Sequence, residues 1–123
     1  MELIDRGTGI PIVIIPGIQG RWEYLRPAVD ALAASSRVIT FPLCDERVAR
    51  WPFDPDKGID GYVDHVKAAL DDRGIAQAAL CGVSFGGLIA LRFAARHPER
   101  ASALIMVSTP GPHWHLRRRH ALY

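Results

Sequence analysis

The amino-acid sequence predicts an α/β fold in which a mainly parallel sheet carries helices on both of its faces. Four short apolar runs, rich in β-branched residues, are typical of strands that are buried on both sides. These runs span residues 12–15, 38–41, 79–83 and 103–107. The stretches between them carry apolar residues at the spacing of amphipathic helices. An alternation of strands and helices along the chain is typical of parallel sheets.

The first half of the chain begins with residues 1–5, which we expect to add a short edge strand. The first long strand, at 12–15, is bounded by a proline on each side. A helix is expected next, because apolar residues recur at i, i+3, i+7 and i+10. These residues are Trp22, Leu25, Val29 and Leu32. The second long strand follows at 38–41.

The second half opens with a longer connection, residues 45–58, which contains two prolines and is predicted to be a loop. It leaves the carboxyl end of a strand, where open α/β sheets bind their ligands. Trp51 and Phe53 therefore either line a pocket or only cover the sheet edge, and the sequence leaves both open. Helices are expected at 59–70 and 85–96, each followed by one of the last two strands.

Length and composition limit the classes of protein. At 123 residues, 49% of them hydrophobic, the chain fits one compact domain or part of one. It has no apolar run of the roughly 18 to 20 residues needed to cross a bilayer, and no signal-peptide pattern begins it. We expect a cytoplasmic protein without a membrane partner. The oligomeric state is left open.

The net charge of +2 comes from the three arginines at residues 117–119, since the chain before them is nearly neutral. This cluster lacks the interleaved aromatic residues and the wider basic face of a nucleic-acid site. We interpret it as a solvated helix face and expect no nucleic-acid partner.

The most informative motif is G-V-S-F-G at residues 82–86, which places Ser84 between a predicted strand and a predicted helix. A tight strand-to-helix turn projects a serine hydroxyl above the sheet only if the residues two positions away are small, hence Gly82 and Gly86. The amides at the start of the following helix point at the same place and stabilise developing negative charge. The motif predicts a nucleophilic serine.

A second motif, P-G-I-Q-G at residues 16–20, follows the first long strand. Acyl transfer needs two backbone donors around the oxyanion, one from the residue after the nucleophile and one from a loop of this kind. The Phe85 and Ile18 amides are the candidate donors of this oxyanion hole.

The chain resembles the N-terminal part of an α/β-hydrolase-fold protein of the single-domain, cofactor-free type. The resemblance implies Ser84 as nucleophile and Ile18 and Phe85 as oxyanion donors. It also separates the chain from haloalkane dehalogenases and epoxide hydrolases, which place an aspartate at this turn. Pro16 stands where the family commonly has histidine, and F-P-L-C-D-E at residues 41–46 replaces a glycine-rich stretch. These departures leave the substrate class open.

A complete catalytic triad is not expected at the edge of the sheet where Ser84 lies. In this family the acid and the histidine follow the serine along the chain. The only acid after Ser84 is Glu99, which together with His97 is expected at the opposite edge of the sheet. Three histidines follow the last strand without an accompanying carboxylate: His113, His115 and His120. We interpret residues 111–123 as the start of a cap or lid segment, in preference to a metal site or a triad histidine, and expect no metal.

The two cysteines are interpreted as reduced thiols. Cys81 lies on a predicted strand three residues before Ser84, where a small buried core residue is expected. Cys44 ends a strand near the predicted active edge and is a candidate substrate contact, but no neighbouring histidine activates it.

The sequence thus predicts that residues 1–110 form the N-terminal core of a hydrolase domain, in a chain that is truncated and inactive by itself. The predicted reaction is hydrolysis of an ester or related acyl substrate, a small molecule, through a Ser84 acyl-enzyme and without a cofactor. Amides, thioesters and carbon–carbon bonds remain open as substrates. One alternative is a non-catalytic small-molecule binding protein of the same fold. Another is a truncated product whose last strand exposes an unpaired apolar edge.

Overall fold

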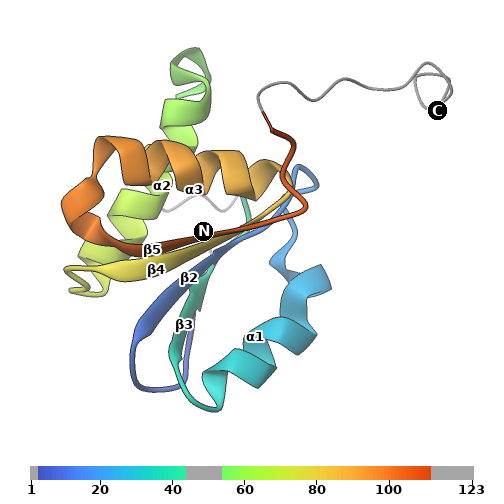
Figure 1. Cartoon of the computed structure of the whole chain (residues 1–123), viewed down its shortest axis with the longest axis vertical. Helices are drawn as coiled ribbons and strands as arrows, with labels where there is room; N and C mark the ends of the chain where they lie inside the picture. Colours follow the sequence, from blue (N-terminus) through green and yellow to red (C-terminus); the bar gives the residue numbers. More distant parts are fainter. Residues whose placement is uncertain (1–2, 44–53, 112–123) are drawn as a thin grey trace, which may run out of the picture.

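A five-stranded mixed sheet with the strand order β1-β3-β2-β4-β5 forms the centre of the molecule (Figure 1). It is seen in a computed structural model that describes residues 3–43 and 54–111. The strands are β1 (Ile4–Arg6), β2 (Pro11–Ile15), β3 (Arg37–Thr40), β4 (Ala78–Val83) and β5 (Ala101–Val107). β1 runs antiparallel to β3, whereas the other neighbouring pairs are parallel. The predicted mainly parallel sheet is confirmed.

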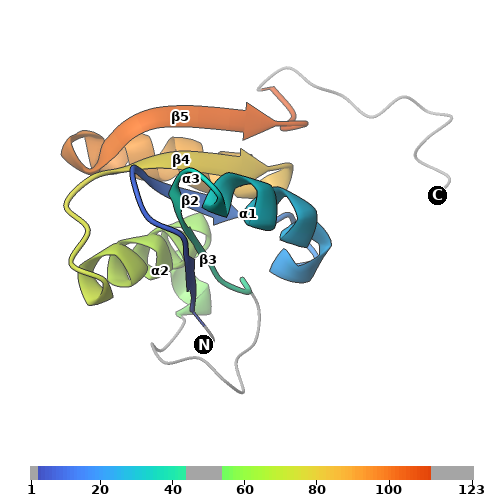
Figure 2. The ribbon, with the colours of Figure 1, turned by 90° about the horizontal axis from the view of Figure 1, so that it is seen from below.

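Three helices cover the two faces of this sheet: α1 (Arg26–Ala33), α2 (Ile59–Asp72) and α3 (Phe85–Arg96). Figures 1 and 2 show α1 on one face and α2 with α3 on the other. Short 3-10 turns precede α1 (Trp22–Leu25), α2 (Pro55–Lys57) and β5 (Pro98–Arg100). None of the helices that the structure describes combines the length and the apolar character needed to cross a membrane.

Alternation along β2 creates one apolar core on each face. Val13 and Ile15 pack against α2 and α3 in the larger core, with Leu70 and Phe93 among their partners. Ile14 points the other way, into a smaller core that Trp22, Val29 and Val38 complete. Because successive side chains of a strand point to opposite faces, a continuous apolar run needs a helix on both sides. For this reason the continuous apolar runs predicted helices on both faces of the sheet.

Two expectations need correction. The amphipathic stretch 22–32 is not one helix, because Pro27 lies in the first turn of α1, where its fixed φ and missing N–H favour a helix start. The last strand is not buried on both faces: Leu104, Ile105, Met106 and Val107 are 38–47% exposed. β5 ends the strand order, so among the described strands only β4 pairs with it. Trp51, Phe53 and most of the predicted loop lie outside the described residues.

Candidate active site

Ser84 lies where β4 ends and α3 begins, at the carboxyl edge of the parallel strands. Its backbone adopts φ 53° and ψ −117°. A positive φ is uncommon for a residue with a side chain and costs roughly 1–3 kcal/mol, so it persists only where the surroundings impose it. The strained strand-to-helix turn predicted from the sequence is therefore present at Ser84.

The glycines of the motif let backbone pack directly on backbone. A Cβ atom on Gly86 would lie 2.2 Å from the carbonyl oxygen of Ile15 and 2.4 Å from that of Pro16. A Cβ atom on Gly82 would lie 2.2 Å from the carbonyl oxygen of Gly86. Any side chain at these two positions would push α3 away from β2 and β4. The glycines of the motif therefore position Ser84 by letting α3 approach β2 and β4 closely.

Hydrogen bonds tie the same turn to the end of β5. The Ser84 amide donates to the Val107 carbonyl oxygen over 2.8 Å. The Ser84 carbonyl oxygen accepts two bonds of 2.9 Å, one from the Gly87 amide and one from the Thr109 hydroxyl. Sequence reasoning missed Thr109 and Gly87. Ser84 and Thr109 both follow predicted strands, and parallel strands that end at one edge bring the residues after them together.

The loop after β2 reaches the same place. Its tight turn is closed by a 2.8 Å hydrogen bond from the Gly20 amide to the Gly17 carbonyl oxygen. Ile15 pairs in register with Gly82, and a Cβ atom on Gly17 would lie 3.7 Å from the Ser84 Cβ. Ile18 and Ser84 line one open cavity of about 290 Å³. Two of the three predicted site residues thus share a cavity.

Phe85, the third predicted residue, begins α3. Its half-buried ring meets that of Tyr62 on α2 edge to face, with 5.6 Å between the centroids. The side chain therefore packs between helices, which leaves only its backbone amide for the predicted role.

Positive charge borders the cavity beside Ser84. Arg21 and Tyr24 both line it, and the Arg21 guanidinium lies 5.8 Å from the Tyr24 ring centroid. The nearby Glu23 carboxylate is 3.8 Å from the Arg21 Nε, a loose and exposed ion pair. Ser84 also lines a second hollow of about 550 Å³, together with residues 108–111. Ser84 therefore adjoins two openings.

Cys81, expected to be a buried core residue, is only partly buried. It packs beside the smaller core, and burial raises the pKa of its thiol. A raised pKa keeps the thiol protonated at neutral pH, which disfavours nucleophilic chemistry. Cys44 lies outside the described residues.

His97 and Glu99 lie at the amino edge of the sheet, as expected. His97 follows the last turn of α3, Glu99 precedes β5, and their closest side-chain atoms are 4.0 Å apart. Residues 112–123, with the remaining three histidines, are outside the described part. Within residues 3–43 and 54–111, no group of three or more His, Cys, Asp or Glu side chains is arranged to hold a metal.

The chain is similar to known hydrolases. Residues 10–123 match the model of the alpha/beta hydrolase fold family. Over 114 residues the chain is 39% identical to 2-hydroxymuconate semialdehyde hydrolase from Pseudomonas sp. strain CF600, covering 89% of this chain and 40% of that protein. It is 30% identical to 2-hydroxy-6-oxo-2,4-heptadienoate hydrolase from Pseudomonas putida, covering 89% and 41%.

Solved structures show the same fold. An epoxide hydrolase from Bacillus megaterium superimposes with a TM-score of 0.77 at 21% identity, over 89% of this chain and 39% of that one. The chain therefore spans about 40% of the length of the relatives it matches. The match over residues 10–123 and the strained serine between β4 and α3 together establish that the chain belongs to the alpha/beta hydrolase fold family.

Proposed function

We propose that the protein is a serine hydrolase that acts on an ester or related acyl group of a small molecule, with Ser84 as its nucleophile. The observation that carries this proposal is the backbone of Ser84, held at φ 53° on a cavity that the Ile18 loop also lines. An aspartate at this turn would suit epoxide opening, whereas a serine suits acyl transfer. The hydrolase names of the curated relatives support the reaction class.

In the proposed reaction the Ser84 Oγ attacks the substrate carbonyl carbon and its proton passes to a general base. The carbonyl π electrons move onto oxygen, where the Ile18 and Phe85 amides donate to the oxyanion. The tetrahedral intermediate collapses, the bond to the leaving group breaks, and the leaving group takes the proton. Water then attacks the acyl-enzyme by the same route and releases the acid and free Ser84.

This chain supplies the nucleophile and both oxyanion donors in the proposal. The helix α3 adds its N-terminal amides and dipole, which favour negative charge beside Ser84. We assign the histidine base and its carboxylate partner to segments outside residues 3–43 and 54–111, because Glu99 and His97 lie at the opposite edge. Residues 111–123 are proposed to begin a cap over this edge.

The test compares the full-length protein with its Ser84→Ala variant. Wild type is expected to react covalently with a fluorophosphonate and to hydrolyse p-nitrophenyl butyrate. Ser84→Ala is expected to lose the label and roughly a thousandfold or more in kcat/KM, since it deletes the atom that forms the acyl-enzyme. Ser102→Ala, which removes an exposed serine hydroxyl from the other end of β5, serves as the control and should keep both.

Equal turnover by wild type and Ser84→Ala would contradict the proposed nucleophile. The alternative of a non-catalytic binding protein makes a different prediction for the same samples: thermal stabilisation by a small ligand, without labelling of Ser84.

A further inference from the structure

Thr109 reaches from the loop after β5 to the turn that carries Ser84. Its hydroxyl donates to the Ser84 carbonyl oxygen over 2.9 Å. The contact depends on Gly87, because a Cβ atom there would lie 1.8 Å from the Thr109 Oγ1 and 2.9 Å from its Cβ. Gly87, the third residue after the serine, therefore leaves room for a threonine from the loop after β5.

The two peptide groups that flank Ser84 are both anchored to this region. On one side the Ser84 amide donates to the Val107 carbonyl oxygen over 2.8 Å. On the other side the Ser84 carbonyl oxygen accepts the bond from Thr109. The φ and ψ torsions of Ser84 are the rotations that connect these two planar groups. Restraining both groups therefore helps to hold the strained values of 53° and −117°.

The second of these peptide groups also contains the Phe85 amide. In a planar trans peptide the C=O and N–H bonds point in opposite directions. A hydroxyl that holds the Ser84 carbonyl oxygen therefore also sets the direction in which the Phe85 N–H points. Donation to the carbonyl oxygen polarises the same amide and strengthens its N–H as a donor.

We propose that Thr109 is a positioning residue that aims and strengthens the Phe85 N–H as an oxyanion donor. This role rests on the proposed serine-hydrolase function. It acts through the Ser84–Phe85 peptide group and involves no contact between Thr109 and the substrate. Donors that are fixed before the oxyanion forms need no reorganisation during the reaction, which is the main source of their effect.

The Thr109 hydroxyl is not needed to satisfy the Ser84 carbonyl oxygen. The Ser84 carbonyl oxygen already accepts a 2.9 Å bond from the Gly87 amide, so removing the threonine hydroxyl leaves no buried acceptor unpaired. The expected cost in folding stability is therefore small, and the expected cost in the rate is larger. The two effects separate in an experiment.

The experiment uses the full-length protein with Thr109→Val, which keeps the shape and loses the donor, and Thr109→Ser, which keeps the donor. For p-nitrophenyl butyrate we expect Thr109→Val to lower kcat about tenfold or more while KM changes less than about twofold, because the oxyanion exists only after binding. Thr109→Ser should recover most of the loss. Affinity for a trifluoromethyl ketone, whose hemiketal places an oxyanion in the hole, should fall in parallel with kcat.

Thr40→Val is the matched control. The Thr40 hydroxyl donates to the Ile14 carbonyl oxygen over 2.8 Å inside the sheet, so this variant removes the same kind of bond from a buried position. It is expected to lower the melting temperature and to leave kcat and the ketone affinity unchanged. Thr109→Val should instead change the melting temperature little and should lower kcat and the ketone affinity.

The outcomes are distinguishable. An active wild type whose Thr109→Val variant keeps its kcat and ketone affinity would overturn the role of Thr109 alone. Thr109→Ser could instead lose as much kcat as Thr109→Val, with a drop in melting temperature like that of Thr40→Val. This result would show that Thr109 only stabilises the fold, and it would also overturn the proposed positioning role. If the wild type neither reacts with fluorophosphonate nor hydrolyses the ester, the assignment of Ser84 as nucleophile is wrong. The positioning role of Thr109 then falls as well.

Discussion

The two edges of the sheet use polar groups in opposite ways. At the carboxyl edge, Ser84 and Ser108 both have φ 53°, and open hollows adjoin them. At the amino edge, charged side chains pair with one another and with backbone carbonyls. The strained conformations lie at the edge with open hollows, and a strained backbone persists only where the surrounding structure imposes it.

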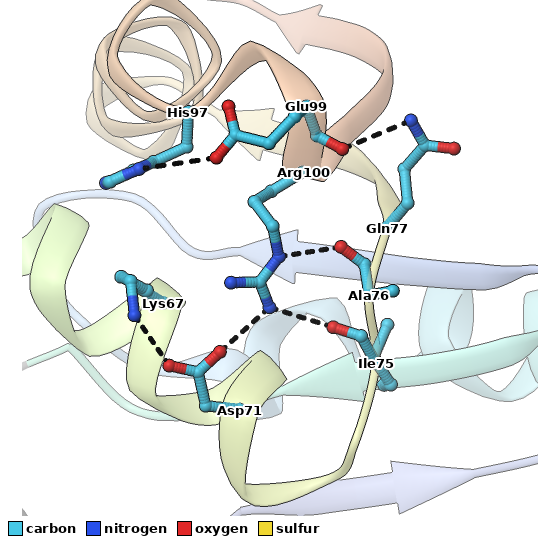
Figure 3. A network of polar contacts seen from close by, with 8 residues as sticks. All are labelled: Lys67, Asp71, Ile75, Ala76, Gln77, His97, Glu99 and Arg100. Carbon is cyan, nitrogen blue, oxygen red and sulfur yellow. Dashed lines mark hydrogen bonds and ion pairs between the residues drawn. The ribbon is translucent and has the colours of Figure 1, made fainter.

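Arg100 is the centre of the amino edge (Figure 3). Its guanidinium donates to the carbonyl oxygens of Ala76 and Ile75 over 2.6 and 2.9 Å, and to the Asp71 carboxylate over 2.9 Å. Lys67 donates to the same carboxylate over 2.7 Å. These bonds join the end of α2, the approach to β4 and the start of β5.

The two edges differ in the features that accompany a reactive site. The amino edge contains a histidine beside a carboxylate, His97 and Glu99, next to the hydrogen-bonded network of Arg100. The carboxyl edge has strained backbone and space for a ligand. A histidine–carboxylate pair alone would favour the amino edge, whereas backbone conformation and open volume favour the edge that carries Ser84.

Gly86→Ala tests the rigidity of the carboxyl edge and should have the largest effect on stability. The added Cβ atom would meet the backbone oxygens of Ile15 and Pro16 at 2.2 and 2.4 Å, and neither can move without shifting β2. We expect a loss of about 3 kcal/mol in the free energy of unfolding, measured by urea denaturation. Gly111→Ala is the control, because open space surrounds that position. Similar stability of the two variants would contradict a rigid turn.

Much of the fold was predictable because strand burial and helix period are local signals. The apolar runs predicted β2, β3, β4 and β5, and the glycine motif predicted the strained turn at Ser84. These local signals do not specify where each strand lies in the sheet. The runs that became β2 and β5 are similarly apolar, yet β2 has neighbours on both sides and β5 lies at the end of the described order. Exposure of β5 therefore followed from topology and not from composition.

The candidate site was predictable in part for the same reason. Ser84 and the Ile18 loop were each predicted from a motif of five consecutive residues, at 82–86 and 16–20. The bond from Thr109 to Ser84 joins residues 25 positions apart and depends on strand register and on the absence of a side chain at Gly87. A pattern of residue types along one segment does not specify such a contact, although adjacent parallel strands make it geometrically accessible.

Arg100→Met tests the hydrogen-bond network of the amino edge. Methionine keeps much of the apolar stem and removes all three hydrogen bonds, leaving two backbone carbonyls without this donor. The Arg100 side chain is only 18% exposed, so we expect a loss of about 2 kcal/mol in the free energy of unfolding. Lys67→Met, which removes a more exposed cation from the same carboxylate, should cost less than about 0.5 kcal/mol. Both variants should keep the rate of Ser84 labelling, and a large change in that rate would mean that the two edges are coupled.

Asp5→Asn is expected to have the smallest effect, which depends on pH. Two hydrogen bonds of 3.0 and 2.8 Å from Arg37 lower the pKa of Asp5, helped by the charges of Arg37 and Arg73 and opposed by burial. Because the folded state favours the carboxylate, this stabilisation is present above the unfolded pKa of about 3.9 and is lost as the pH falls through the lower folded value. We expect Asp5→Asn to cost about 1 kcal/mol at pH 7 and progressively less below pH ~4, measured by urea unfolding across this range. Asp30→Asn, which breaks a more exposed ion pair with Arg6, should cost under about 0.5 kcal/mol at pH 7. A cost of Asp5→Asn that stayed constant down to pH 2 would show that the Arg37 pair does not stabilise the amino edge through the charge of Asp5.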